Sequence, residues 1–329
     1  ASRLLTTLIT LLGVAVIVFV VIRVVPGNPI AMMLPPGATD ADIARLRALY
    51  GLDKSIFEQF VIWFGNVLGG DFGTSITTRQ PVRTLVLGRL PATLELSVMA
   101  LVIASAIGGG LALAGTRMRG TRTEGAIDVA NGMALSVPDF LWGLVFILLF
   151  GVLWPVFHIS GRVSPALDIQ FATNFLLFES VLRLRFDIWA DLVAHMFMPA
   201  LALAIPLAAV IAQLLKQSLK ETMHLDYVTL ARTKGYGENH VILREALPNA
   251  ILPTLTLVGV QFTFLIGGTV IIERLFSYEG LGNLAIDAVI NRDLPLIQGI
   301  VLLFAALFTA VNLLVDLAYA ALNPRLRHG

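Results

Sequence analysis

The chain has 329 residues, of which 57% are hydrophobic and 14% are charged, and its mean hydropathy is +0.84. Soluble domains carry about 25% charged residues, so this composition predicts a protein that crosses a membrane several times. The net charge of +1 gives no support for nucleic-acid binding, and the absence of cysteine excludes disulfides and cysteine-based metal sites.

Six apolar stretches are long enough to cross a bilayer core of about 30 Å at about 1.5 Å per residue. They fall at residues 4–25, 94–115, 129–155, 194–216, 250–272 and 296–321. The first is interpreted as a span and not as a cleaved signal peptide. It is longer than a signal-peptide core of roughly 7–15 residues, and no Ala-x-Ala site follows it. We therefore predict an all-α polytopic membrane protein with six transmembrane helices.

The long polar segment of residues 26–93 separates the first two spans and is predicted to carry short amphipathic helices outside the membrane. Thr39 or Asp40 is expected to cap a helix that ends at Gly51, and Ser55 is expected to cap another. The apolar face of the second helix comprises Phe57, Phe60, Val61, Phe64 and Leu68. We interpret this helix as lying at an interface, because polar residues interrupt it.

Local features of the second and third spans predict how they pack. Ala104, Gly108 and Ala112 recur at four-residue spacing, which lets a neighbouring helix approach closely. Pro138 is expected to kink the third span by removing a backbone hydrogen bond. Asp139 beside it is either a functional residue or a carboxylate that caps the restarted helix.

Polar side chains inside the predicted spans are the candidates for a translocation path. They are Asn131, Asp139, Gln213 and Gln261, whereas Asn312 and Asp316 in the sixth span are interpreted as structural. Hydrogen bonding between helices explains each of them equally well.

No cofactor or metal site is predicted in the chain itself. The sequence contains no Gly-x4-Gly-Lys-Ser/Thr motif, so ATP binding by a P-loop is excluded. The five histidines show no spacing typical of metal ligands. They are His158, His195, His224, His240 and His328.

The polar stretch of residues 217–249 lies between the fourth and fifth spans. Residues 226–234 contain no Gly or Pro, and Leu230 stands four residues from both Asp226 and Lys234, which predicts a short amphipathic helix. Gly235 and Gly237 are expected to end this helix through positive φ, and Lys234 suits the negative end of its dipole.

The run DYVTLARTKG, followed by HVILREALPNAILPTL, resembles the cytoplasmic coupling loop of ABC-importer permeases. The small residue, the glycine and the proline of that pattern fall at Ala231, Gly235 and Pro248. The usual Glu-Ala-Ala triplet reads Thr229-Leu230-Ala231, a departure common in the peptide-permease branch. The similarity covers nearly the whole chain and points to the integral-membrane subunit of the dipeptide, oligopeptide and nickel class of importers.

This resemblance implies half of a translocation path for peptides or similar solutes in a prokaryotic inner membrane. It also implies a homologous second permease, two cytoplasmic ATPase subunits that bind ATP and Mg²⁺, an extracytoplasmic solute-binding protein, and no catalysis by this chain. The residues expected to couple to the ATPases are Asp226, Tyr227, Ala231, Arg232, Lys234 and Gly235. The substrate is left open among dipeptides, longer peptides, glutathione, opines, sugar conjugates and nickel chelates.

The distribution of basic residues favours cytoplasmic termini, with a cytoplasmic tail at residues 322–329. Eleven would lie inside, namely Arg3, Arg117, Arg119, Arg122, Lys216, Lys220, Arg232, Lys234, Arg244, Arg325 and Arg327. Five would lie in the short outside loops, namely Arg162, Arg183, Arg185, Arg274 and Arg292. Six more lie in the long first loop and are not counted, because long loops follow the positive-inside rule poorly. The excess in the remaining segments follows that rule.

Three alternatives remain at this stage. A secondary transporter driven by an ion gradient would need paired intramembrane carboxylates or inverted repeats, and neither is evident. An intramembrane enzyme would need a catalytic pair within two spans, and no such motif occurs. A purely structural subunit is disfavoured by the coupling-loop pattern.

Overall fold

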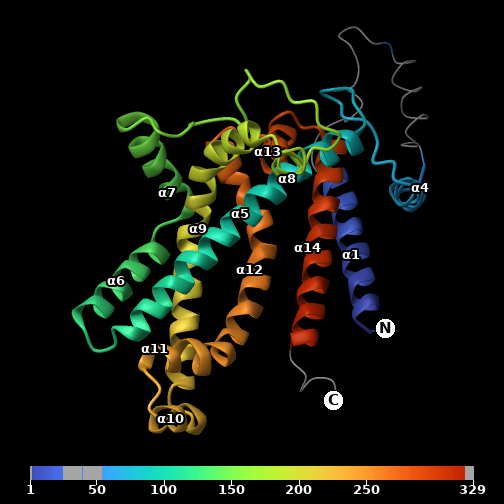
Figure 1. Ribbon diagram of the computed structural model, residues 1–329. Coiled ribbons are helices and arrows are strands. Elements are labelled where there is room, and N and C mark those ends of the chain that lie inside the picture. Colours follow the sequence, from blue (N-terminus) through green and yellow to red (C-terminus); the bar gives the residue numbers. More distant parts are fainter. Residues whose placement is uncertain (1, 25–38, 40–53, 323–329) are drawn as a thin grey trace. The chain divides into compact units, whose positions relative to one another are not determined.

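The computed structural model describes residues 2–24, 39 and 54–322 (Figure 1). The described part is helical, and its single β-bridge joins Thr74 to Pro81. The longer helices are α1 (Ser2–Val24), α4 (Ile56–Leu68), α5 (Val82–Arg117), α6 (Arg122–Ser136), α7 (Asp139–Phe146), α9 (Phe186–Thr222), α10 (Asp226–Thr233), α12 (Leu247–Leu275), α13 (Leu281–Ile290) and α14 (Leu294–Leu322). The shorter ones are α8 (Leu176–Leu182), α11 (Glu238–His240) and the π-helices η1 (Ile147–Leu153) and η2 (Val241–Ala246). The all-α prediction is confirmed.

Some predictions fall outside the described residues. They are the end of the first span at residue 25, the helix from Thr39 or Asp40 to Gly51, and the tail that follows Leu322.

Four helical runs in the described part are long and apolar enough to cross a membrane: α5, α9, Glu238–Leu275 and Leu294–Val315 of α14. The pair of α6 with α7 and η1 makes a fifth if it is taken as one bent span. In α1 the apolar stretch recognised among described residues is Ile9–Val21, which is shorter than a full span. The fold is that of a multi-pass membrane protein, and the count of six spans stays a prediction.

The helices of the second and fourth predicted spans begin earlier than their apolar stretches. Helix α5 starts at Val82 instead of residue 94 and continues through Pro91. Helix α9 starts at Phe186 instead of residue 194 and contains Pro199 and Pro206. Hydropathy locates the membrane-embedded part of a helix, whereas backbone hydrogen bonding extends each helix into its polar flank.

The third predicted span is broken instead of kinked. Helices α6 and α7 meet at an angle of 101°. Val137 is extended (φ −98°, ψ 123°), as a residue before proline prefers, and Pro138 also lies outside helical geometry (φ −56°, ψ 147°). Asp139 then opens α7, with its own Oδ1 accepting the Phe140 N–H at 2.7 Å. Asp139 is the first residue of the restarted helix, but the N-cap is Pro138 and no side chain caps α7, so the expected capping by Asp139 is wrong.

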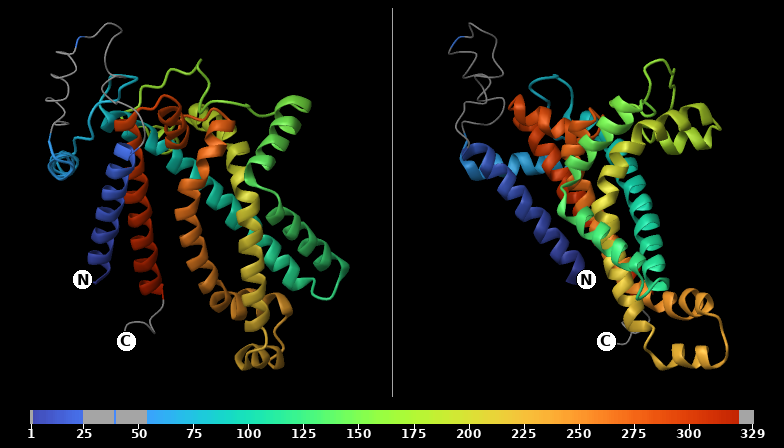
Figure 2. Two further views of the ribbon diagram at one scale, coloured as in Figure 1. Left: turned by 180° about the vertical axis from the view of Figure 1, so that it is seen from behind. Right: turned by 90° about the vertical axis from the view of Figure 1, so that its left-hand side faces the viewer.

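The described chain divides into two compact units, Ala1–Leu90 with Asn283–Ala310, and Pro91–Gly282 with Val311–Gly329. In the second unit α9 is central, because α6, α7, α8 and α12 all contact it (Figure 2). A Cβ atom on Gly108 of α5 would lie 2.5 Å from the Ala208 carbonyl oxygen of α9. Ala104 and Ala112 are fully buried, so the predicted close helix approach is confirmed.

In the first unit, α4 packs against α1 through aromatic rings. Ser55 caps α4 with a capping box that includes Glu58, as predicted for its N-terminus. Phe60 lies edge-on to Phe19 of α1 at 5.2 Å, and Trp63 lies 5.4 Å from the same ring. Other residues of the predicted apolar face, Phe57, Val61 and Leu68, are exposed.

Candidate functional site

The polar stretch between α9 and α12 folds into the predicted short helix. Helix α10 lies at one end of α9, and α8 lies at the opposite end (Figure 1). Gly235 has φ +84°, and the Tyr236 N–H bonds the Ala231 carbonyl while the Gly235 N–H bonds the Arg232 carbonyl. This pair of bonds is a Schellman ending, which requires the left-handed conformation that glycine adopts most easily.

The prediction for Gly237 is wrong. This glycine has φ −67° and ψ 152°, and it begins α11 instead of ending α10. Gly235 alone, in the left-handed conformation, lets the last carbonyls of α10 form their hydrogen bonds. Gly237 instead adopts an extended conformation as the N-cap of α11.

The inner face of α10 is fully packed. Val228 is 0% exposed and Ala231 is 4% exposed. Both belong to an apolar cluster with Leu219 of α9 and with Val241 and Ile242 of η2. A larger side chain at Ala231 would displace this cluster. The small residue at this position therefore sets how closely α10 packs against α9 and η2.

The outer face of α10 presents polar and apolar side chains together. Leu230 is 55% exposed and Tyr227 is 39% exposed, although both are large and apolar. Asp226 and Lys234 are also exposed, and within the described residues Lys234 has no ion-pair partner. An exposed apolar pair with a charge at each end is suited to contact with another protein.

Two polar links hold the loop together. Arg232 bonds Glu238 at 2.9 Å and the Met223 carbonyl at 3.3 Å, and the Glu238 carboxylate raises the pKa of the guanidinium. Asn249 donates to the Tyr227 hydroxyl at 2.9 Å. Arg232 is therefore engaged in contacts within the loop, whereas Lys234 has no ion-pair partner among the described residues.

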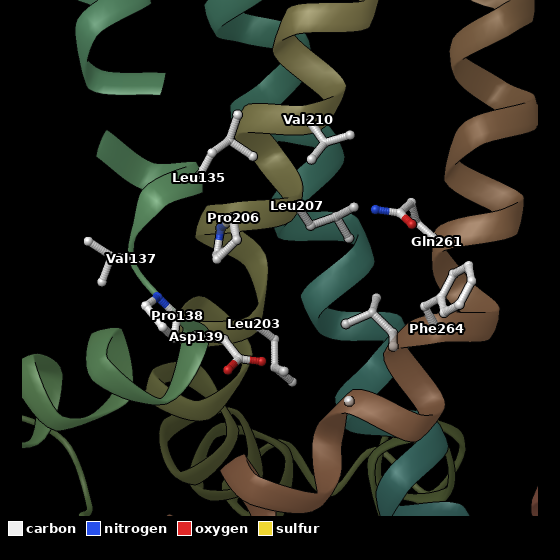
Figure 3. A pocket seen from close by; sticks show the side chains of 12 residues that line it. Leu135, Val137, Pro138, Asp139, Leu203, Pro206, Leu207, Val210, Gln261 and Phe264 are labelled. Atoms are coloured by element: carbon white, nitrogen blue, oxygen red, sulfur yellow. The ribbon is translucent and has the colours of Figure 1, made fainter. Parts of the chain in front are cut away.

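A second feature is the kink pocket, a cavity of about 310 Å³ bounded by the α6–α7 break, α9 and α12. Asp139 of α7 and Gln261 of α12 line it from opposite sides, among apolar side chains such as Leu203, Pro206 and Phe264 (Figure 3). The break at Pro138 places Asp139 here, because it turns α7 away from the direction of α6.

The other predicted path residues lie outside the kink pocket. Asn131 is buried in α6, and Gln213 is exposed on α9. Asn312 of α14 accepts a hydrogen bond from Thr263 of α12 at 3.4 Å, a contact between helices of the kind that its structural interpretation requires. The side chain of Asp316 lies outside the described part of the chain.

Sequence reasoning missed a buried charge network opposite the α10 end. Arg162 bonds Glu95 at 2.6 Å and the Asn174 carbonyl at 2.8 Å, and both charged side chains are less than one-tenth exposed. Glu273 is fully buried in the last turn of α12, where its carboxylate accepts a hydrogen bond from the Thr93 hydroxyl at 2.6 Å. Partners far apart in sequence leave no local pattern that could reveal them.

The prediction that the histidines do not cluster is wrong for two of them. The rings of His158 and His195 stack at 3.9 Å with an interplanar angle of 7°. His158 follows η1 and His195 belongs to α9, so only the tertiary fold brings them together.

Two family models together match most of the chain. Residues 104–328 match the binding-protein-dependent transport system inner membrane component, and residues 1–97 match the N-terminal part of the same kind of component. The Di/tripeptide transport system permease protein DppB of Pseudomonas aeruginosa is 36% identical, covering 100% of this chain and 98% of its own length. The Dipeptide transport system permease protein DppB of Escherichia coli K12 is 37% identical, covering 97% of this chain and 95% of its own length.

Solved structures resemble the fold at low sequence identity. A chain of the inward-facing MetNI methionine ABC transporter aligns with a TM-score of 0.54 at 13% identity, covering 70% of this chain and 93% of its own. A chain of an amino acid ABC transporter aligns with a TM-score of 0.50 at 17% identity, covering 72% and 94%. The fold agrees with the sequence match, and the chain belongs to the family of inner membrane components of binding-protein-dependent transport systems.

Proposed function

We propose that this permease forms half of a path for dipeptides or other short peptides, and that α10 receives the movement of cytoplasmic ATPases. The relatives named for di- and tripeptide transport match the chain over nearly its full length, which supports the substrate class. The partners are a homologous second permease, two ATPase subunits that bind ATP and Mg²⁺, and an extracytoplasmic solute-binding protein. Both termini and α10 lie on the cytoplasmic side, in line with the distribution of basic residues.

The observation that carries the coupling role is the two-sided character of α10. Its inner face is buried on α9 and η2 through Val228 and Ala231, while Leu230 and Tyr227 remain exposed. A helix seated in this way moves as a rigid body with its support, so displacement by a docked partner is passed to α9 and α12. Of the predicted coupling residues, Asp226, Tyr227 and Lys234 make the outer contact, whereas Ala231, Arg232 and Gly235 hold the helix in place.

The kink pocket is the proposed contribution of this subunit to the path. Its volume of about 310 Å³ lies at the lower end of small-molecule sites, which supports a path completed by a second permease. Asp139 can attract the ammonium group of a peptide and Gln261 can bond its amide groups. Asn131 and Gln213 lie outside the pocket, and any role they have requires another conformation or the partner.

The test is ATP-driven uptake of radiolabelled dialanine into vesicles that contain the full complex. Leu230→Glu places a charge on the exposed face of α10 and is expected to abolish both ATPase retention and uptake. Leu230→Met keeps the apolar contact and is expected to preserve both. Leu182→Glu changes a leucine that is 66% exposed on α8, at the far end of α9, and is expected to retain the ATPases.

Each outcome bears on a separate part of the proposal. Full ATPase retention and uptake with Leu230→Glu would contradict docking through α10. Failure of the wild-type complex to take up dialanine, with its ATPases retained, would contradict the substrate class alone. An ion-gradient-driven transporter is set aside because the family consists of binding-protein-dependent systems.

A further inference from the structure

A cluster of potential metal ligands lies near the end of α9 opposite α10. It comprises His158, from the segment that follows η1, together with Asp191 and His195 of α9. One ligand atom from each residue lies within 4.8 Å of the other two. None of the three lines the kink pocket, so the cluster is separate from the proposed path.

Two of the ligand atoms already have the spacing that a metal ion requires. His195 Nδ1 and Asp191 Oδ2 are 3.4 Å apart, one helical turn from each other on α9. Ligands bound about 2.1 Å from a tetrahedral ion lie about 3.4 Å from one another. The pair therefore has the separation of two ligands of one ion, although the hydrogen bond from Nδ1 to the Asp191 carbonyl must be given up when an ion binds.

The Asp191 carboxylate is fixed from outside the helix. The Ser164 N–H donates to Oδ2 at 2.8 Å, and the Ser164 hydroxyl donates to Oδ1 at 2.6 Å. Outer partners of this kind orient ligating carboxylates in metal sites. They leave further lone pairs on both oxygens, since each carboxylate oxygen accepts about two hydrogen bonds.

His195 is 4% exposed, and its Nδ1 lies 2.8 Å from the Asp191 carbonyl oxygen. A carbonyl only accepts, so the ring carries its proton on Nδ1 when no ion is bound. For an ion to bind at Nδ1, this hydrogen bond must break and Nδ1 must offer its lone pair to the ion instead. The exposed His158 supplies the third ligand when its ring turns out of the stack.

We propose that His158, Asp191 and His195 bind one divalent transition-metal ion, for which Zn²⁺ is the probe. Two imidazoles and one carboxylate suit zinc, nickel and copper better than magnesium or calcium, which prefer oxygen ligands. The ion clamps the segment that follows η1 onto α9, on the side of the second unit away from α10. Because the ion binds the folded arrangement, it also raises the thermal stability of the chain.

The test uses the full chain purified in detergent with a tag that contains no histidine and stripped of metal by a chelator. Zn²⁺ is titrated in competition with a chromophoric chelator, and Co²⁺ absorption reports whether nitrogen ligands bind. His158→Gln removes an exposed ligand, so loss of folding is not expected. His224→Gln is the matched control, because His224 is also exposed but lies at the α10 end of α9.

The expected result is one Zn²⁺ per wild-type chain and a rise in melting temperature on binding. His158→Gln should weaken Zn²⁺ binding at least about tenfold. Loss of a residue that only bonds a metal ligand already costs about that much, and His158 is itself a ligand. His224→Gln should bind as the wild type does. The proposal is overturned if the wild type has no stoichiometric site, or if His158→Gln and His224→Gln bind Zn²⁺ equally well.

Discussion

Asn249, in the first turn of α12, donates a hydrogen bond of 2.9 Å to the hydroxyl of Tyr227 on α10. Apolar packing joins the other side of α10 to α9 and η2. The short helix is therefore attached to both long helices that flank it. A force applied to α10 reaches α12 directly and reaches α9 through buried contacts, which is the geometry that a coupling element needs.

Tyr227→Phe removes the hydroxyl and keeps the ring. Because a hydrogen bond contributes about 0.5–1.5 kcal/mol, we expect transport by the full complex to fall about two- to tenfold while the ATPases stay bound. The measurement is dipeptide uptake per ATP hydrolysed. Tyr236→Phe is the control, since Tyr236 stacks on His240 at 4.4 Å through its ring. Equal ratios in the two variants would contradict a role for the Tyr227–Asn249 bond.

Gly108→Ala tests the close contact of α5 with α9. The added Cβ would lie 2.5 Å from the Ala208 carbonyl and 2.9 Å from Ile211, so the helices must separate and the melting temperature should fall. Gly109→Ala is the control, because nothing lies within 4 Å of a Cβ there. Alanine loses less backbone freedom on folding than glycine does, so Gly109→Ala should be neutral or should stabilise the fold by about 0.5–1 kcal/mol. A similar response at both positions would argue against tight packing at Gly108.

The buried Glu95–Arg162 pair should respond differently to single and double replacement. Arg162→Met leaves the Glu95 carboxylate without its counter-charge, and breaking a buried pair costs about 3–5 kcal/mol. Adding Glu95→Gln removes the stranded charge and should recover most of the loss. Chemical denaturation of the detergent-solubilised chain measures both losses. The control is Arg185→Ala, which breaks an exposed pair with Asp187 and is expected to change the stability little. If the double variant is no more stable than Arg162→Met alone, the unpaired Glu95 charge is not the cause of the lost stability.

The Glu179 carboxylate predicts a loss of stability in acid. Hydrogen bonds from Thr173 and from the Ala172 N–H lower its pKa from 4.5 to about 2. Because the folded pKa is the lower one, the stabilisation is complete above about pH 4.5 and disappears as the pH falls toward 2. The gap in melting temperature between wild type and Glu179→Gln should therefore be largest at neutral pH and shrink below pH 4.5.

Glu221→Gln, at an exposed carboxylate bonded to Gln217, is the control for loss of a surface charge. A gap for Glu179→Gln that stays constant from pH 7 to pH 3 would show that its carboxylate does not hold the 171–174 segment.

Local sequence signals were sufficient to predict helix α10 and the close packing of α5 against a neighbouring helix. Helix α10 ends at Gly235 because glycine adopts positive φ easily. Helix α5 approaches α9 closely at Gly108 because glycine has no Cβ atom there. The cap of α4 by Ser55 follows from a pattern within four residues. In each case the determinants are neighbours in sequence or one helical turn apart.

The missed features depend on the tertiary fold. Glu95 and Arg162 pair across 67 residues, and His158 meets His195 only because the chain after η1 returns to α9. The break at Pro138 was expected as a kink, because sequence shows that a hydrogen bond is lost but not how far the helix then turns. Asp139 and Gln261 were chosen as polar residues within spans, and the fold supplied the pocket that joins them.

Cross-linking from α10 tests the central claim most directly. The chain contains no cysteine, so Leu230→Cys introduces a single reactive thiol on the exposed face of α10. With a short bifunctional reagent in the assembled complex, Leu230→Cys should cross-link to the ATPase subunit, whereas Leu182→Cys on α8 should not. A complex that transports substrate but gives no ATPase cross-link from Leu230→Cys would contradict coupling through α10.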